Sequence, residues 1–255
     1  IRNMTSDAQG NIYLADTENR AIRKIDTDGN VTTWAGGGNV GYWDGEQDKL
    51  SIRIEGPTGM IFDSSGNAYI TAQYRNNIIK IDTAGKATVW ANDNSDHGRN
   101  NGPVDEATFK GPRDIVFDSN GNMFVLENHS IRKIVFSGAS AVVEDFVGNG
   151  DWGQEDGVGT AARFSEAWNL VIDPYDNIFF ADIHHNKIRM VTPDAVVTTI
   201  AGNGNWGYSD GLGDNARFRN PYGIALDSNN DILVNDTENN RIRKIAISRD
   251  SNGKV

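Results

Sequence analysis

The chain contains no cysteine, which excludes disulfide bonds, thiolate zinc sites and a cysteine nucleophile. No apolar run is long enough to cross a bilayer as a helix, so membrane insertion is not expected. Basic residues are scarce, with 24 Lys and Arg against 35 Asp and Glu, and the formal net charge is −11. Because an acidic surface repels phosphate backbones, nucleic acid is not expected as a partner, whereas cations and neutral ligands suit such a surface.

The chain does contain one sequence motif that is repeated five times. Each copy has an aspartate, a tight turn, an aliphatic strand, and a further strand rich in Ile, Arg and Lys. The anchor aspartates are spaced by 54 to 56 residues, and they are Asp7, Asp63, Asp118, Asp173 and Asp227. A period this long and regular indicates a repeat architecture. No linker interrupts it, so residues 1–255 are predicted to form a single domain.

The fourth copy shows how one unit is expected to fold. Residues 169–173 form a short aliphatic run, and residues 174–177 (Pro-Tyr-Asp-Asn) have the composition of a turn. Residues 178–182, 187–191 and 196–202 then read as three further strands, the last rich in β-branched residues. Four antiparallel strands cannot bury both faces alone, but such units can stack radially. The sequence therefore predicts an all-β fold, a β-propeller of four-stranded antiparallel blades.

The fifth copy carries Asn220-Pro-Tyr-Gly-Ile-Ala-Leu-Asp227, then Asp236, then Asn240-Arg-Ile-Arg-Lys244. This resembles the NHL-repeat family of β-propellers, and the resemblance extends over the whole chain. The long loops, with their Asp-Gly pairs at Asp44, Asp156 and Asp210, look like a subgroup whose members are commonly extracellular or on the cell surface. Their aromatic residues recur with the unit and are predicted to pin the loops; these are Trp43, Trp152, Trp206, Phe109, Phe164 and Phe218.

The last blade is expected to be incomplete, because its fourth strand should begin at residues 253–255. Three explanations stay open. The chain is a piece of a larger polypeptide, which would allow a six-bladed ring; it forms five blades without full closure; or another subunit donates the strand. Strand donation would make the protein a homo-oligomer or polymer.

Two sets of residues are predicted at the entrance of the inner strands. Asn3, Asp114 and Asn169 occupy the position where the NHL pattern has glycine, and their oxygens would suit calcium. The alternative is that they cap loops or bind channel water. One residue earlier lie Arg2, Arg113 and Trp168, with Tyr222 in the last repeat. Aromatic and arginine side chains together can bind sugars or peptide side chains, although packing under the loops is the alternative.

Other polar residues are given structural roles. Asp16 and Asp236 are each expected to cap backbone amides or to pair with the arginine of the next strand (Arg23 and Arg243). His129, His184 and His185 are interpreted as solvated loop residues rather than metal ligands. Asn128 begins an Asn-x-Ser sequon and is the expected glycosylation site if the protein is secreted.

Taken together, the residues predict a non-catalytic extracellular module that binds protein or glycan and self-assembles through its incomplete blade. No complete catalytic set is visible. The alternative is a metal-dependent hydrolase or lactonase with calcium held by Asn3, Asp114 and Asn169.

Overall fold

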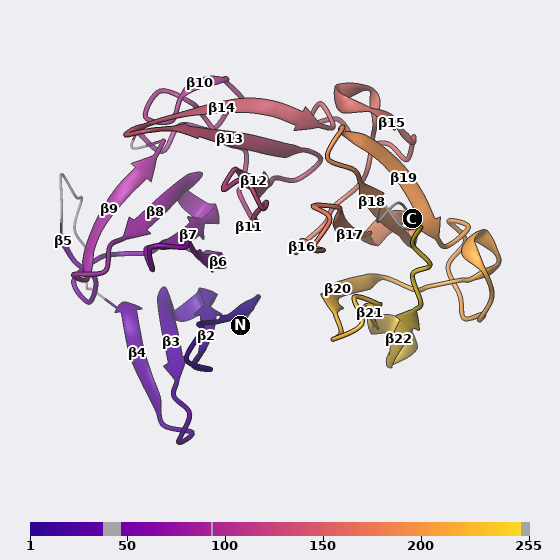
Figure 1. Cartoon of the computed structure of the whole chain (residues 1–255), viewed down its shortest axis with the longest axis horizontal. Helices are drawn as coiled ribbons and strands as arrows, with labels where there is room; N and C mark the ends of the chain where they lie inside the picture. The colour runs from indigo at the N-terminus through magenta and orange to yellow at the C-terminus, as the bar shows by residue number, and fades with distance from the viewer. Residues whose placement is uncertain (38–46, 93, 251–255) are drawn as a thin grey trace. The chain divides into compact units, whose positions relative to one another are not determined.

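The computed structural model describes residues 1–37, 47–92 and 94–250; Trp43 and Asp44 of the sequence predictions lie outside this part. The described chain is all-β, a five-bladed β-propeller built from antiparallel sheets, and short 3₁₀ turns connect neighbouring strands within four of them (Figure 1). It divides into two compact units, residues 1–115 with 134–144, and residues 116–133 with 145–255. The division passes through the third blade.

The first unit contains the first two blades. The first sheet has the order β1-β2-β3-β4, and the second has the order β5-β9-β8-β7-β6. Their bounds are β1 Met4–Ser6, β2 Ile12–Asp16, β3 Ala21–Ile25, β4 Val31–Gly36, β5 Gln47–Asp48, β6 Pro57–Phe62, β7 Ala68–Ala72, β8 Asn77–Ile81 and β9 Lys86–Ala91.

The third and fourth sheets repeat the second, with the orders β10-β14-β13-β12-β11 and β15-β19-β18-β17-β16. The third comprises β10 Gly102–Pro103, β11 Asp114–Phe117, β12 Met123–Leu126, β13 Ile131–Ser137 and β14 Ser140–Val147. The fourth comprises β15 Gly157–Val158, β16 Val171–Ile172, β17 Ile178–Asp182, β18 Lys187–Val191 and β19 Val196–Ala201.

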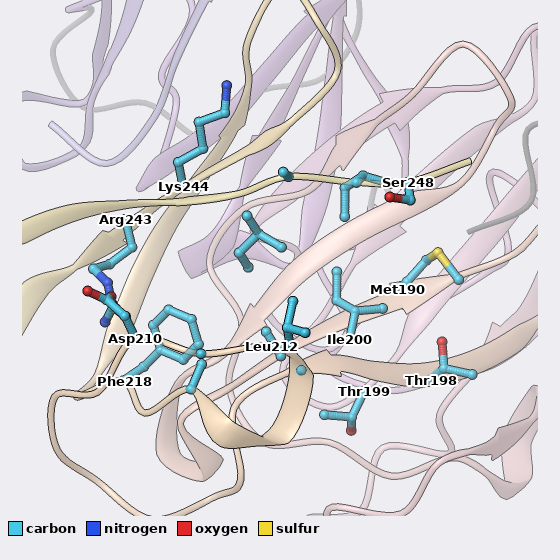
Figure 2. A pocket seen from close by; sticks show the side chains of 17 residues that line it. Met190, Thr198, Thr199, Ile200, Asp210, Leu212, Phe218, Arg243, Lys244 and Ser248 are labelled. Carbon is cyan, nitrogen blue, oxygen red and sulfur yellow. The ribbon is translucent and has the colours of Figure 1, made fainter. Parts of the chain in front are cut away.

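The fifth blade has three strands in the described residues, β20 Pro221–Leu226, β21 Ile232–Asp236 and β22 Arg241–Ile245. Residues 253–255, where its fourth strand was expected to begin, lie outside the described part of the chain. The outer strand β22 borders the cavity drawn in Figure 2.

The short strands β5, β10 and β15 go beyond the predicted four-stranded blade. Each comes from the long loop that precedes a blade and pairs antiparallel with the fourth strand of that blade. In the fourth blade, Gly157 pairs with Val197 and Val158 with Val196. The long loops therefore add a fifth strand to the sheet instead of only covering it.

The anchor aspartates build the turns between the first and second strands. The Asp7 carboxylate accepts hydrogen bonds from the backbone N–H of Gln9 (3.0 Å) and of Asn11 (2.9 Å). Gly10 has a φ of +86°, a left-handed value that glycine adopts at little cost. The same carboxylate pattern holds at Asp173, where Pro174 opens the turn. The repeated aspartates are thus structural, as their recurrence implied.

The predicted pairing between the strand-end carboxylates and the next strand is confirmed. Asp16 pairs with Arg23 at 3.0 Å, and Asp236 pairs with Arg243 at 3.0 Å. In the fourth blade, Asp182 and Arg189 are both fully buried and lie 2.9 Å apart.

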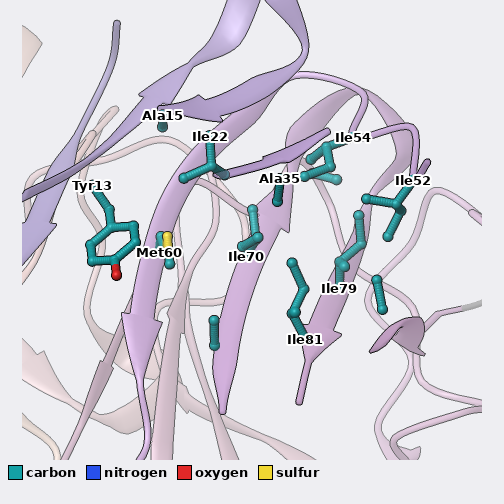
Figure 3. Packing of buried hydrophobic residues seen from close by; sticks show 13 residues of the cluster. Tyr13, Ala15, Ile22, Ala35, Ile52, Ile54, Met60, Ile70, Ile79 and Ile81 are labelled. Carbon is teal, nitrogen blue, oxygen red and sulfur yellow. The ribbon is translucent and has the colours of Figure 1, made fainter. Parts of the chain in front are cut away.

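Apolar side chains pack between neighbouring sheets. In the first unit, Tyr13 and Ile22 of the first blade pack with Ile70 and Ile79 of the second, as Figure 3 shows. In the second unit, Phe179 and other residues of the fourth blade pack with the fifth blade. Each blade buries a face on its neighbour within a unit, which is the reason for the repeat's regular spacing.

Candidate functional site

The predicted calcium ligands of the first unit bond to each other and to the backbone. The Asn3 amide donates to Asp114 Oδ1 at 2.8 Å, while Asn3 Oδ1 accepts the backbone N–H of Met4 at 2.8 Å. Asp114 is buried, and it lies so close to Gly59 that a Cβ there would meet Asp114 Oδ1 at 2.6 Å. The NHL-pattern glycine at position 59 therefore makes room for the aspartate of the next repeat.

Asn169, the third predicted ligand, lies in the second unit. Its Oδ1 accepts the backbone N–H of Ile224 at 3.0 Å, and its Nδ2 donates to the Ile224 carbonyl at 2.8 Å. The amide thus acts like a strand backbone against β20, at the place where the pairing of β20 with β21 shifts register. The oxygens of Asn3 and Asn169 are each used inside the fold, and calcium binding stays a prediction.

The predicted aromatic pair comes together in the second unit. The Trp168 and Tyr222 rings stack with centroids 5.6 Å apart and an interplanar angle of 16°, and both residues are half-buried. Of the two predicted arginines, which belong to the first unit, Arg2 is exposed and Arg113 is buried. Arg113 packs inside the fold and is no surface ligand group there.

A cavity of about 780 Å³ lies between β22 and the fourth blade. Figure 2 shows Arg243 and Lys244 of β22 on one side of it, with Thr199 and Ile200 of β19 on another. Leu212, from the loop before the fifth blade, also lines it and is 88% exposed. The cavity lies entirely within the second unit.

The cavity has the backbone surroundings that β19 has in the fourth blade. There, β19 lies between β18 and β15, and the loop runs Asp156-Gly157-Val158-Gly159. The fifth blade has the same loop sequence pattern, Asp210-Gly211-Leu212-Gly213, followed by the same kind of 3₁₀ turn. We call the space between β22 and residues 211–212 the strand slot.

The carboxylate of Asp210 also lines the strand slot. In the fourth blade, Asp156 accepts both the backbone N–H and the hydroxyl of Thr199, each at 3.0 Å, and also pairs with Arg189 at 2.9 Å. Its equivalent Asp210 pairs with Arg243, accepts the Tyr208 hydroxyl at 3.1 Å, and is 74% exposed. Asp210 thus has the place of an acceptor for a fourth strand.

The sequence predictions did not identify the slot residues Gly211, Leu212 and Arg243. Aligning the Asp-Gly-x-Gly segment of the fourth loop with that of the fifth would have marked the slot. The signal was present, but Asp210 was interpreted only as part of a loop motif and not as a partner of a strand.

A second cavity, of about 700 Å³, lies in the first unit between the turns of the first two blades. Asp7 and Tyr13 line it, together with Lys49 and Trp34. Burial, followed by the hydrogen bond to Asp7, raises the pKa of Tyr13 to about 12. Burial alone would raise the pKa of Asp7, but hydrogen bonds from Asn11 and Tyr13 hold it below its usual value. Asp7, Asn11 and Tyr13 thus bond to one another at the edge of this cavity.

The loop aromatics divide into two groups. Phe109, Phe164 and Phe218 are buried and pin the loops, as predicted, whereas Trp152 and Trp206 are 55% and 69% exposed. The rings of Trp152 and Trp206 contact neighbouring side chains but are not buried as the three phenylalanines are.

The glycosylation prediction falls in a tight turn. Asn128 is half-buried, and the sequon's Ser130 is fully buried with its hydroxyl donating to Glu127 Oε2 at 2.8 Å. Within the described residues, no group of three His, Cys, Asp or Glu side chains could hold a metal ion. No helix in the same part of the chain is long and apolar enough to span a membrane.

Comparison with known proteins gives a consistent family. A family model described as the NHL repeat matches residues 218–245. NHL repeat-containing protein 2 of Bos taurus is 28% identical over 273 residues, covering 91% of this chain and 37% of that protein. Protein SUPPRESSOR OF QUENCHING 1, chloroplastic, of Arabidopsis thaliana is 26% identical, covering 96% of this chain and 24% of that protein. The chain thus spans between a quarter and two fifths of the length of these curated relatives.

Among solved structures, an auxiliary nutrient binding protein from Bacteroides ovatus superposes with a TM-score of 0.66 at 22% identity. The match covers 96% of this chain and 69% of that one. At this identity the likeness establishes the fold alone.

Proposed function

The chain is an NHL-repeat β-propeller, and we propose that it is a non-catalytic binding and assembly module that accepts an extended strand in the slot beside β22. The observation that carries the proposal is the slot itself. It offers the edge of β22 that no strand of the described residues pairs with, the backbone of residues 211–212 and the Asp210 carboxylate, in the arrangement that holds β19 one blade earlier. An unpaired strand edge is a template for another strand.

The repeat specifies what the slot would take. The fourth strand of the fourth blade reads Val196-Val-Thr-Thr-Ile-Ala201. The fourth strand of the first blade begins one position later, so that Val31 takes the place of Val197 and Thr33 that of Thr199. In a strand placed like β19, the second residue would pair with both Gly211 and Ile245, and the fourth would reach Asp210. The occupant is therefore an extended segment with β-branched residues at its start and threonine at its fourth position.

We propose a second copy of this chain as the source of that strand, since strands of this chemistry occur in the chain itself. Head-to-tail donation of this kind gives oligomers or open polymers. An exposed Leu212 and a 69% exposed Ile242 beside the slot favour association, because covering them removes apolar surface from water.

A peptide with the sequence Val-Val-Thr-Thr-Ile-Ala tests the slot. We expect it to bind the full chain and to raise its melting temperature, since a ligand of the native state stabilises it. Replacing the peptide's second threonine by valine, or Asp210→Ala in the protein, removes a charge-assisted hydrogen bond and is expected to weaken binding about tenfold. A scrambled peptide that binds equally well would refute recognition by the slot.

Self-assembly is tested separately by light scattering over a range of protein concentrations. We expect oligomers that grow with concentration and dissociate when the peptide is added in excess. A chain that stays monomeric at high concentration yet binds the peptide would refute donation by a second copy and leave the slot intact.

A second candidate site is the Trp168–Tyr222 pair, favoured by its stacked and half-exposed rings. It would bind a glycan or an aromatic side chain of a protein through its ring surface. We expect Trp168→Ala and Tyr222→Ala to abolish binding in a glycan or pull-down assay without unfolding the chain. Retained binding would refute this assignment.

The same proposal places the protein outside the cell or on its surface, in keeping with the nutrient-binding description of the similar Bacteroides structure. Secretion of a full-length, signal-bearing form into the medium, measured by cell fractionation, tests this location. Recovery only from the cytosol would contradict it.

A further inference from the structure

Three of the chain's four histidines lie around one exposed tryptophan. The Trp152 ring centroid is 5.1 Å from that of His184, 5.3 Å from that of His185 and 5.7 Å from that of His129. The histidines come from two blades: His129 from the turn between β12 and β13, and the other two from the 3₁₀ turn Ile183–His185. Sequence reasoning treated them as separate solvated residues.

Hydrogen bonds to buried groups hold the two histidines of the fourth blade in place. His185 Nδ1 lies 3.0 Å from Asp182 Oδ1, and this carboxylate is fully buried. The backbone N–H of His184 donates to Ser165 Oγ at 3.1 Å, and the Ser165 hydroxyl in turn donates to Asp182. Arg189 fixes the Trp152 loop, since it bonds to the Glu155 carbonyl and to Asp156. The His185 ring, the His184 backbone and the Trp152 loop are therefore held in place before any ligand binds.

Comparison with the next repeat shows that this cluster is not a feature of the unit. Trp206 occupies the same position in the following loop, but the guanidinium of Arg219 lies over its ring at 5.1 Å. Arg219 there pairs with Glu238 at 2.8 Å, and Glu238 occupies the place of His184. The repeat accounts for the tryptophan but not for the histidines, so the histidines need an explanation of their own.

We propose that Trp152 and its histidines form a binding site for a neutral saccharide. The exposed indole offers an apolar face against which a pyranose ring can stack. The rim is polar: His184 is 45% exposed, and its Nε2 lies 3.5 Å from Glu166 Oε2, itself 35% exposed. Imidazole nitrogens can donate to or accept from sugar hydroxyls, and a carboxylate can accept from them. A strongly anionic ligand would be disfavoured by the nearby carboxylates and by the net charge of −11.

This site lies on different residues from the strand slot and from the Trp168–Tyr222 pair, so it extends the proposed function. The site as proposed needs no metal ion.

An array of neutral oligosaccharides, probed with the full chain, tests the site. We expect at least one glycan to bind, and Trp152→Ala to weaken that binding about tenfold or more because the stacking surface is lost. His184→Ala is expected to weaken it to a smaller degree. The matched control is Trp206→Ala, which removes an exposed tryptophan at the same repeat position and is expected to change binding less than about twofold.

The outcomes separate the proposals. Absence of any bound glycan, equal losses for Trp152→Ala and Trp206→Ala, or a loss confined to Trp168→Ala would each overturn the Trp152 site. Binding that disappears on addition of a chelator would also overturn it, since a bridging metal would then be required. Binding of the slot peptide to the Trp152→Ala variant shows that the variant is folded and that the slot is independent.

Discussion

The position of Arg189 in the fourth blade allows a prediction with an internal control. Its guanidinium is fully buried, and it pairs with the fully buried Asp182 at 2.9 Å and with Asp156 at 2.9 Å. Arg23 occupies the same repeat position in the first blade and pairs with Asp16 at 3.0 Å, but 36% of its side chain is exposed. The two arginines therefore differ in burial far more than in pairing.

Removing one partner of a buried ion pair strands the other charge away from water and costs about 3–5 kcal/mol, whereas an exposed pair contributes at most about 1 kcal/mol. For a chain of this size, about 2–4 °C of melting temperature is lost per kcal/mol. We therefore expect Arg189→Met to lower the melting temperature by about 6–20 °C, and Arg23→Met by less than about 4 °C. Calorimetry and urea unfolding of the two variants measure the difference.

The double variant Asp182→Asn with Arg189→Met sharpens the test. Removing both charges leaves no stranded ion, so part of the lost stability is expected to return. Equal destabilisation by Arg189→Met and Arg23→Met, or no recovery in the double variant, would refute the reasoning that burial sets the cost.

Further predictions concern the turns, the tyrosines and the metal. A Cβ at Gly202 (φ +94°) would lie 2.3 Å from the Asn186 carbonyl oxygen, while a Cβ at Gly121 (φ +79°) would meet nothing within 4 Å. We therefore expect Gly202→Ala to lower the free energy of unfolding in urea by at least about 1 kcal/mol more than Gly121→Ala does. Burial is the main cause that raises the pKa of both Tyr13 and Tyr69 from 10.0 to about 12, so the folded state favours their neutral form. The stability that this contributes is complete below about pH 10 and is lost as the pH rises toward about 12. We expect the tyrosinate absorbance of these residues to appear only at the pH at which the chain unfolds. The calcium hypothesis expects the melting temperature of chelated protein to rise on addition of calcium, and an unchanged value together with no metal by elemental analysis would refute it.

Much of the fold follows from residues that act within one repeat. The anchor aspartates, the turn glycines and the pairing of Asp236 with Arg243 are local, so their spacing predicted the turns and the blade. The two-residue strands β10 and β15 were missed, because they pair through backbone groups and Gly102–Pro103 shares no side-chain pattern with Gly157–Val158.

The candidate sites were less predictable, because they depend on side chains from different repeats. Asn169 has a ligand-type oxygen, yet its amide completes the pairing of β20. His129 and His184 lie on separate blades, and no spacing in the sequence indicates that both meet Trp152. Trp168 and Tyr222 were grouped because they occupy equivalent places in adjacent repeats, but the stacking of one ring on the other was not predicted.

The loop strands also bear on how such a chain grows during evolution. The strand β15 precedes its blade in sequence yet pairs with the last strand of that blade. A duplicated segment of one period that begins in the long loop would therefore carry a whole blade together with the short strand that pairs with its outer edge. A duplicated segment that begins at an anchor aspartate would instead separate each short loop strand from the outer strand with which it pairs. Insertions that begin within the long loops are therefore the ones expected to yield a stable additional blade from the first generation.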